Sequence, residues 1–155
     1  MRLVADLESD HFLEKMTKIH CIAVMNADNP SQTWVFGPEE IDDGVALLQS
    51  ADELIFHNGV TFDVPAIKKL HPNFSTDNLT LTDTLVLSRL IRADLLERDI
   101  RNSWADPESR FPKRLFGSHG LKAWGHRLGV LKGDFNQKTD WKDWSQEMQD
   151  YCVQD

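Results

Sequence analysis

The chain has 155 residues, of which 41% are hydrophobic and 27% are charged, as expected for a soluble globular protein. It contains no run of about 18 apolar residues, which argues against a membrane helix, and it turns acidic after four residues, which argues against a signal peptide. The formal net charge of −8 argues against tight binding of nucleic acid through a broad basic surface, although bound divalent cations reverse such a charge locally.

Charge is distributed unevenly towards the C-terminal end. Residues 110–132 include six basic residues and no Asp or Glu, whereas most of the charged residues in 133–155 are Asp or Glu. A basic strip beside an acidic, metal-loaded pocket would suit a phosphate backbone, and a solvated loop and helix face explain the pattern equally well. The two cysteines, Cys21 and Cys152, lack the spacing of a metal site, so we expect reduced thiols and a cytoplasmic protein.

The first half of the chain alternates between strand and helix patterns. Strands are expected over residues 2–7, 20–25 and 32–36, and the short turns between them predict antiparallel hairpins. A helix is expected over 38–50, a strand over 53–57, a helix over 62–70 and a strand near 79–81. This order predicts an α/β fold in one domain, with a mixed sheet whose first three strands are antiparallel and whose later strands are parallel, flanked by helices.

The second half is expected to be mainly helical. Asp83 is the expected cap of a helix with four apolar residues facing inward, namely Leu85, Leu87, Leu90 and Ile91. The polar, proline-containing segment 98–116 is expected to be a long loop. Ser118 is expected to cap a helix that stops near Gly129, and a last helix should begin near Trp141 or Ser145.

Asp6 and Glu8 form the first candidate site. Residues two apart on a strand project to the same face, so both carboxylates can reach one cation. The same spacing recurs elsewhere in this acidic chain as expected loop charge, for example at Asp106 and Glu108. Asp6 and Glu8 differ because they follow an apolar run that predicts a central strand, where charges are costly unless they are paired or bound to metal.

Two further segments carry candidate residues. Asn58, Phe62 and Asp63 lie where a strand gives way to a helix, a common place for catalytic groups, although Asp63 could equally stabilise the helix dipole and Asn58 could bond its own turn. Tyr151 and Asp155 are four residues apart and would share one helix face. Together the four carboxylates offer the oxygen ligands that two Mg²⁺ or Mn²⁺ ions prefer, and two such ions can support in-line phosphoryl displacement.

These segments resemble the DEDD exonucleases of the ribonuclease-H-like fold, in their tyrosine subtype. The family's D-x-E, N-x₃-[FY]-D and Y-x₃-D motifs match residues 6–8, 58–63 and 151–155. The stretches FHNGVTFDVPAIKKL, DTLVLSRLI and KRLFGSHGLKAWGHRLGVLKGDF are similar to the proofreading domain of bacteriophage family A DNA polymerases. The resemblance covers essentially the whole chain and implies a single 3′–5′ exonuclease domain, either the N-terminal part of a polymerase or a separately encoded enzyme.

The resemblance also implies a role for each site residue. The metal ligands would be Asp6, Glu8, Asp63 and Asp155. Tyr151 would orient the attacking water together with Glu8. Asn58 and Phe62 would line the terminal nucleotide, and Phe12 is a candidate wedge against a base, although a core or surface aromatic explains it more simply. His119 and His126 are not expected to bind metal, and Trp141 and Trp144 are expected to anchor the last helix.

The implied substrate is a single-stranded or frayed DNA 3′ end, from which nucleoside 5′-monophosphates are released during replication proofreading. A polymerase domain would be the partner, in the cytoplasm of an infected bacterium if a phage encodes the chain. An exoribonuclease of the same family and a nuclease-inactive binding module remain open as alternatives. Because the family continues beyond its last motif, we expect a form extended past Asp155 to bind metal and cleave more strongly.

Overall fold

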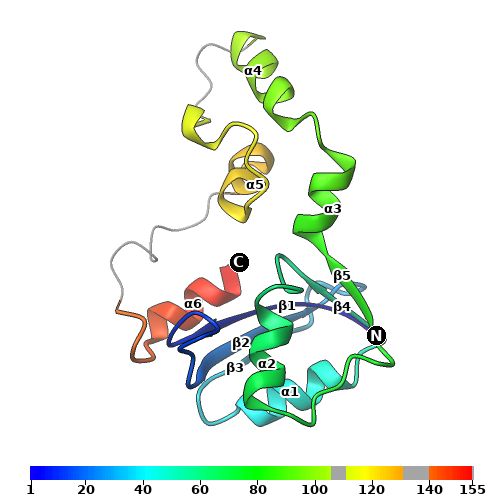
Figure 1. The fold of residues 1–155 in the computed structure, drawn as a ribbon, viewed down its shortest axis with the longest axis vertical. Coiled ribbons are helices and arrows are strands. Elements are labelled where there is room, and N and C mark those ends of the chain that lie inside the picture. Colours follow the sequence, from blue (N-terminus) through cyan, green and yellow to red (C-terminus); the bar gives the residue numbers. More distant parts are fainter. Residues whose placement is uncertain (106–110, 131–139, 155) are drawn as a thin grey trace. The chain divides into compact units, whose positions relative to one another are not determined.

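The computed structural model describes residues 1–105, 111–130 and 140–154 (Figure 1). The chain divides into two compact units, one formed by residues 1–83 with the C-terminal segment from residue 133, and the other by residues 84–132. Each unit is described by itself below. Among the described residues, no helix is both long enough and apolar enough to cross a membrane.

The first unit is built on a five-stranded mixed sheet with the order β3-β2-β1-β4-β5. β1 pairs with β2, and β2 with β3, in antiparallel fashion, whereas the β1–β4 and β4–β5 pairs are parallel. The mixed sheet expected from the sequence is thereby confirmed. The strands span Arg2–Ser9 (β1), Ile19–Asn26 (β2), Thr33–Phe36 (β3), Glu53–Phe56 (β4) and Thr80–Asp83 (β5).

Two helices, α1 (Ile41–Gln49) and α2 (Asp63–Leu70), pack their apolar residues into the main hydrophobic core of the first unit. Along β1 the side chains alternate, with Leu3, Ala5 and Leu7 buried and the residues between them half-buried. The buried three join the main core with apolar residues of α1 and α2, such as Leu48 and Ile67. Because successive strand residues point to opposite faces, Asp6 and Glu8 occupy the other face of the sheet.

That other face is covered by α6 (Gln146–Gln154), which contacts β1 and β2 (Figure 1). In the β1–β2 register Glu8 is opposite Cys21, and residues opposite each other in a ladder share one face. Cys152 of α6 is in hydrogen-bond contact with Cys21. The helix begins after Ser145, whose Oγ accepts from the Met148 N–H at 3.2 Å, in agreement with the later of the two expected starts.

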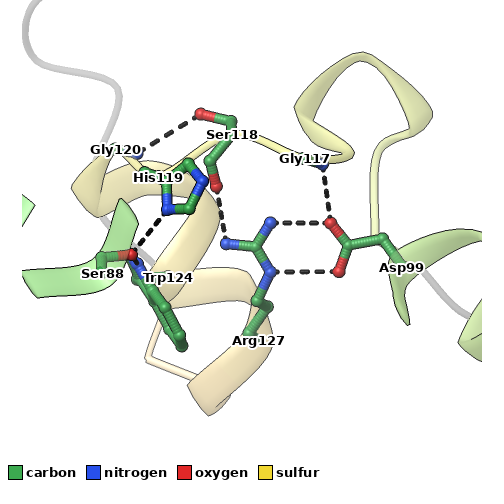
Figure 2. A network of polar contacts seen from close by, with 8 residues as sticks. All are labelled: Ser88, Asp99, Gly117, Ser118, His119, Gly120, Trp124 and Arg127. Atoms are coloured by element: carbon green, nitrogen blue, oxygen red, sulfur yellow. Dashed lines mark hydrogen bonds and ion pairs between the residues drawn. The ribbon is translucent and has the colours of Figure 1, made fainter. Parts of the chain in front are cut away.

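The second unit contains α3 (Thr84–Ile91), α4 (Leu95–Ala105), a 3₁₀ turn η1 (Lys113–Leu115) and α5 (Leu121–Leu128). Figure 2 shows the polar network inside it. Arg127 makes a two-pronged ion pair with the nearly buried Asp99, with distances of 3.1 and 2.7 Å, and Asp99 also accepts from the Gly117 N–H at 2.8 Å. Such a buried pair is stable only because further hydrogen bonds satisfy both partners.

A second part of the network centres on Ser88, the buried residue of α3. Its Oγ lies 2.7 Å from His119 Nδ1 and accepts from the Trp124 indole N–H at 3.0 Å (Figure 2). The expectation that Leu87, Leu90 and Ile91 point inward is wrong, since they are 41%, 73% and 68% exposed, and only Leu85 of the four is partly buried. The buried residue of α3 is Ser88, at the centre of the polar network.

Two further expectations for this half of the chain are corrected. The segment 98–116 is not one long loop, because α4 extends to Ala105 and η1 covers Lys113–Leu115. The polar residues that suggested a loop include Asp99, which faces Arg127. Gly120, rather than Ser118, is the N-cap of α5, while Gly129 ends the helix with a left-handed φ of 74°, as expected.

Candidate active site

The site is built around the C-terminal half of β1. The parallel pairing of β1 with β4 ends at Val4 and Ile55, but β1 continues to Ser9. The described β1–β4 register therefore stops before Ala5, while β1 itself runs on for five more residues. Asp6 and Glu8 lie in this stretch, half-buried and on the same face.

Asp63 brings the second segment to β1. It is the first residue of α2 and is only 4% exposed. The backbone N–H of Leu7, the residue between Asp6 and Glu8, lies near enough to this carboxylate to lower its pKa. Burial raises the pKa of Asp63 to about 7, and the charge of Asp83 adds to this rise, while hydrogen bonds from Leu7 and from its own backbone oppose it.

The third segment reaches β1 through α6. Cys152 Sγ contacts the Asp6 carbonyl oxygen at 3.5 Å. The pKa of the Cys152 thiol is raised by its hydrogen bond with Cys21, by burial, and by the nearby charges of Asp6 and Glu8. The sequence segments around residues 6, 63 and 152 therefore converge on one strand.

Tyr151 and the tryptophans next to it fix the start and the inner face of α6. Tyr151 is 7% exposed and its ring meets Trp141 edge-on at 6.4 Å. The Trp141 carbonyl oxygen lies 2.9 Å from Nε2 of the buried His20, and the Trp144 indole donates to Gln149 at 3.2 Å. These contacts confirm that both tryptophans anchor the last helix. Asp155, the expected fourth carboxylate ligand, lies outside the described residues.

The turn between β4 and α2 holds Asn58 in an unusual conformation. Its φ of 74° is left-handed, which asparagine tolerates better than most residues. The Asn58 side-chain oxygen accepts from the Thr61 hydroxyl at 2.7 Å, so here the amide supports its own turn. Gly59 passes close to Phe56, because a Cβ added at Gly59 would lie 2.3 Å from the Phe56 Cβ.

Asp83 braces this turn from the neighbouring strand. It is 7% exposed and ends β5, and its two carboxylate oxygens accept from the backbone N–H groups of Asn58 and Val60, both at 3.1 Å. From the sequence it was expected only to cap α3. Its place at the C-terminal end of a parallel strand was the signal that could have indicated a role near the site.

The two aromatic candidates are in different environments. Phe62 precedes α2 and is partly buried against the main core. Phe12, in the loop after β1, is 87% exposed, which excludes a core aromatic and agrees with the other simple alternative, a surface aromatic.

In the described part of the chain, no three His, Cys, Asp or Glu side chains are grouped closely enough to hold a metal ion. The residues nevertheless suit a hard divalent cation, because the donors are carboxylates and because Asp63 is buried, which raises its pKa and would favour a cation beside its anionic form.

Comparisons with known proteins agree with this arrangement, although no family model matches the chain. The chain is 33% identical over 177 aligned residues to a DNA-directed DNA polymerase of Enterobacteria phage T3, and 32% identical to that of Escherichia phage T7. Both alignments cover 99% of this chain but only 25% of the relative, so the chain spans about a quarter of these polymerases.

Solved structures share the fold at lower identity. Brucella melitensis NrnC matches with a TM-score of 0.64 and 18% identity, over 98% of this chain and 65% of that one. Escherichia coli RNase D, an exoribonuclease, matches with a TM-score of 0.57 and 13% identity, over 98% and 35%. The structure of an E. coli ExoI–ssDNA complex matches with a TM-score of 0.56 and 13% identity, over 99% and 38%. The fold is the ribonuclease-H-like α/β fold of these nucleases.

Proposed function

Because the chain belongs to the 3′–5′ exonuclease domains of phage DNA polymerases, we propose that it hydrolyses the terminal phosphodiester bond at DNA 3′ ends, releases nucleoside 5′-monophosphates, and serves replication proofreading. The observation that carries the proposal is the convergence on β1. Asp63 lies beside the backbone of Leu7, and Cys152 contacts the Asp6 carbonyl, so that segments more than fifty residues apart in sequence meet beside Asp6 and Glu8.

We assign metal binding to four carboxylates. Asp6, Glu8, Asp63 and Asp155 would hold the divalent cations through their carboxylate oxygens. When bound, two Mg²⁺ or Mn²⁺ ions lower the pKa of the attacking water and stabilise the attacking and leaving oxygens of an in-line displacement. Burial raises the pKa of Asp63 to about 7, and a cation bound beside it would favour its anionic form.

The remaining site residues position water and substrate. The Tyr151 hydroxyl and Glu8 orient the attacking water and accept its hydrogen bonds. The packing of the Tyr151 ring against Trp141 supports this role, because it restricts the ring. Asn58 and Phe62 line the terminal nucleotide, and the exposed ring of Phe12 stacks on a base of the same strand. The strand must be single or frayed for its last phosphate to reach the carboxylates.

The test is the replacement of both Asp6 and Glu8 by Ala. Both side chains are only half-buried, so we expect the doubly substituted chain to fold and to bind single-stranded DNA, but to lose all measurable cleavage of a 5′-labelled oligonucleotide in Mg²⁺. Circular dichroism and a binding isotherm provide the controls for folding and binding. Residual stepwise shortening of the oligonucleotide by the variant would refute the mechanism.

Sugar preference is a separate part of the proposal. The likeness to DNA polymerases favours DNA, whereas the fold is shared with an exoribonuclease. Matched DNA and RNA oligonucleotides distinguish the two, and faster shortening of the RNA would favour an exoribonuclease instead. We further propose that a polymerase domain, in the same chain or a separate one, delivers the frayed end, in the cytoplasm of an infected bacterium.

A further inference from the structure

An open pocket of about 340 Å³ lies at the end of β1 where the loop to β2 begins. One wall is the β1–β2 loop and the other is the segment just before α6, some 125 residues later in the chain, and both belong to the first unit. The residues that line it are Asp10, His11, Lys15, Thr17, Lys18, Lys142 and Asp143.

The loop wall is held in shape by hydrogen bonds. The Asp10 carboxylate, 5% exposed, accepts from the backbone N–H groups of Thr17 and Lys18 and from the Thr17 hydroxyl. Lys69 of α2 donates to the Leu13 carbonyl at 2.7 Å. Asp10 is therefore engaged with its own loop, and its charge is directed at backbone donors rather than at a ligand.

The other wall is anchored next to the same strand. The carbonyl of Trp141, the residue before Lys142, lies 2.9 Å from Nε2 of the buried His20 at the start of β2. The Lys142 N–H donates to the Asp140 side chain at 3.1 Å, which fixes the backbone from which Lys142 extends. Both walls thus present lysines from ordered backbone.

The charge of the pocket is opposite in sign to that of the chain. Three lysines line it in a protein whose formal charge is −8. Asp143, the remaining acidic residue of the lining, is 85% exposed and lies 3.9 Å from Lys18, so this ion pair is weak and readily replaced. Lys15 and Lys142 are both exposed, and they can reach an anionic ligand from opposite walls of the pocket.

We propose that this pocket binds a backbone phosphate of the single-stranded nucleic acid, away from the scissile bond, through Lys15 and Lys142. This inference rests on the proposed function and extends it to a substrate contact. Phe12 supports the assignment, since its exposed ring is next to His11 of the pocket lining, and an aromatic ring beside basic side chains is the usual surface for a single strand. The pocket lining begins at Asp10, directly after β1, and β1 carries Asp6 and Glu8. A single-stranded nucleic acid can therefore contact both the pocket and the proposed metal ligands.

The experiment measures binding rather than cleavage. A fluorescent single-stranded oligothymidylate is titrated with the chain in EDTA at several NaCl concentrations, and log K is plotted against log[NaCl]. Because Lys15 and Lys142 share one phosphate, we expect replacement of both by Ala to reduce the slope by about 0.7, the value per phosphate for single strands, and each single replacement to reduce it by less. Lys15→Arg and Lys142→Arg keep the charge and should keep the slope.

Lys68→Ala is the matched control, because Lys68 is an exposed lysine of the same unit that donates to Thr76 and is not part of the lining. If the Lys15 and Lys142 variants change the slope no more than Lys68→Ala does, the proposal is overturned. Thymidine 5′-monophosphate, tested as a competitor, separates the two sources of phosphate. If the lysine variants lose binding of free thymidine 5′-monophosphate but keep the salt-dependence slope for oligothymidylate, the pocket is a product site. That result also overturns the proposal.

These outcomes are distinct from a failure of the proposed function. A chain that cleaves DNA in Mg²⁺ but shows unchanged slopes in the lysine variants retains the function and loses the phosphate site. If the chain cleaves no DNA, but replacement of Lys15 and Lys142 reduces the slope of log K against log[NaCl], the phosphate contact stands and the exonuclease assignment fails.

Discussion

Asp83 shows how a single side chain can set the geometry of the site from a strand that carries no expected ligand. It accepts two backbone hydrogen bonds from the turn at Asn58 and Val60, and its charge also raises the pKa of Asp63. The fold retains this repulsion between two buried carboxylates, which costs free energy in the metal-free chain. The turn that Asp83 fixes leads directly into α2 and its first residue, Asp63.

Replacement of Asp83 by Asn should therefore impair cleavage as well as stability. An Asn side chain can accept only one of the two N–H groups and presents its own donors to the other, so we expect unfolding to be easier by about 1–3 kcal/mol. Misplacement of Asp63 should slow single-turnover cleavage by about tenfold to a hundredfold. Asp99→Asn, which also removes charge from a buried carboxylate that braces a backbone N–H, is the control and should affect stability alone.

At the scale of elements, the junction between β4 and α2 is the most constrained connection near the site. Gly59 is the position where the chain passes against Phe56, and the left-handed Asn58 precedes it. The close approach lets α2 begin only a few residues after β4, which places its first residue, Asp63, beside Leu7 of β1.

Gly59→Ala tests this constraint. The added Cβ would lie 2.3 Å from Phe56 Cβ and 2.6 Å from its Cγ, so the backbone or the ring must move. We expect a loss of about 1–3 kcal/mol in unfolding free energy, measured by urea denaturation, with a parallel fall in cleavage. Gly120→Ala is the matched control, since its Cβ would meet only the Ser118 Oγ at 3.7 Å. Equal stability of the two variants would contradict the close approach.

At the scale of the whole molecule, the proposed function requires an acidic chain to bind an acidic polymer. The formal charge of −8 repels a nucleic-acid strand at low salt, and the carboxylates proposed as ligands are the closest part of that charge to the scissile phosphate. Divalent cations change the sign at this one place. The lysines of the pocket after β1 would provide a contact that does not depend on metal.

We therefore expect Ca²⁺ to tighten binding of a phosphorothioate-protected single strand to the wild-type chain by several-fold, compared with EDTA at the same ionic strength. The chain with Asp6 and Glu8 both replaced by Ala should show no such response, because the cations no longer have their ligands. Fluorescence anisotropy measures both. Equal affinities of the wild-type chain in Ca²⁺ and in EDTA would show that the cations do not offset the charge of the site.

The sequence by itself determined the mixed sheet, which strands are antiparallel and which are parallel, and the three segments that meet at the site. These features could be predicted because alternation of apolar residues and motif spacing are local properties. It failed over residues 98–105, where polar side chains suggested a loop, because Asp99 is stabilised in a helix by Arg127, a partner 28 residues away. Only the tertiary structure decided that Asp83 braces the turn at Asn58 and that lysines from both ends of the chain share one pocket. Such features depend on which distant residues become neighbours, and that is fixed by packing rather than by local pattern.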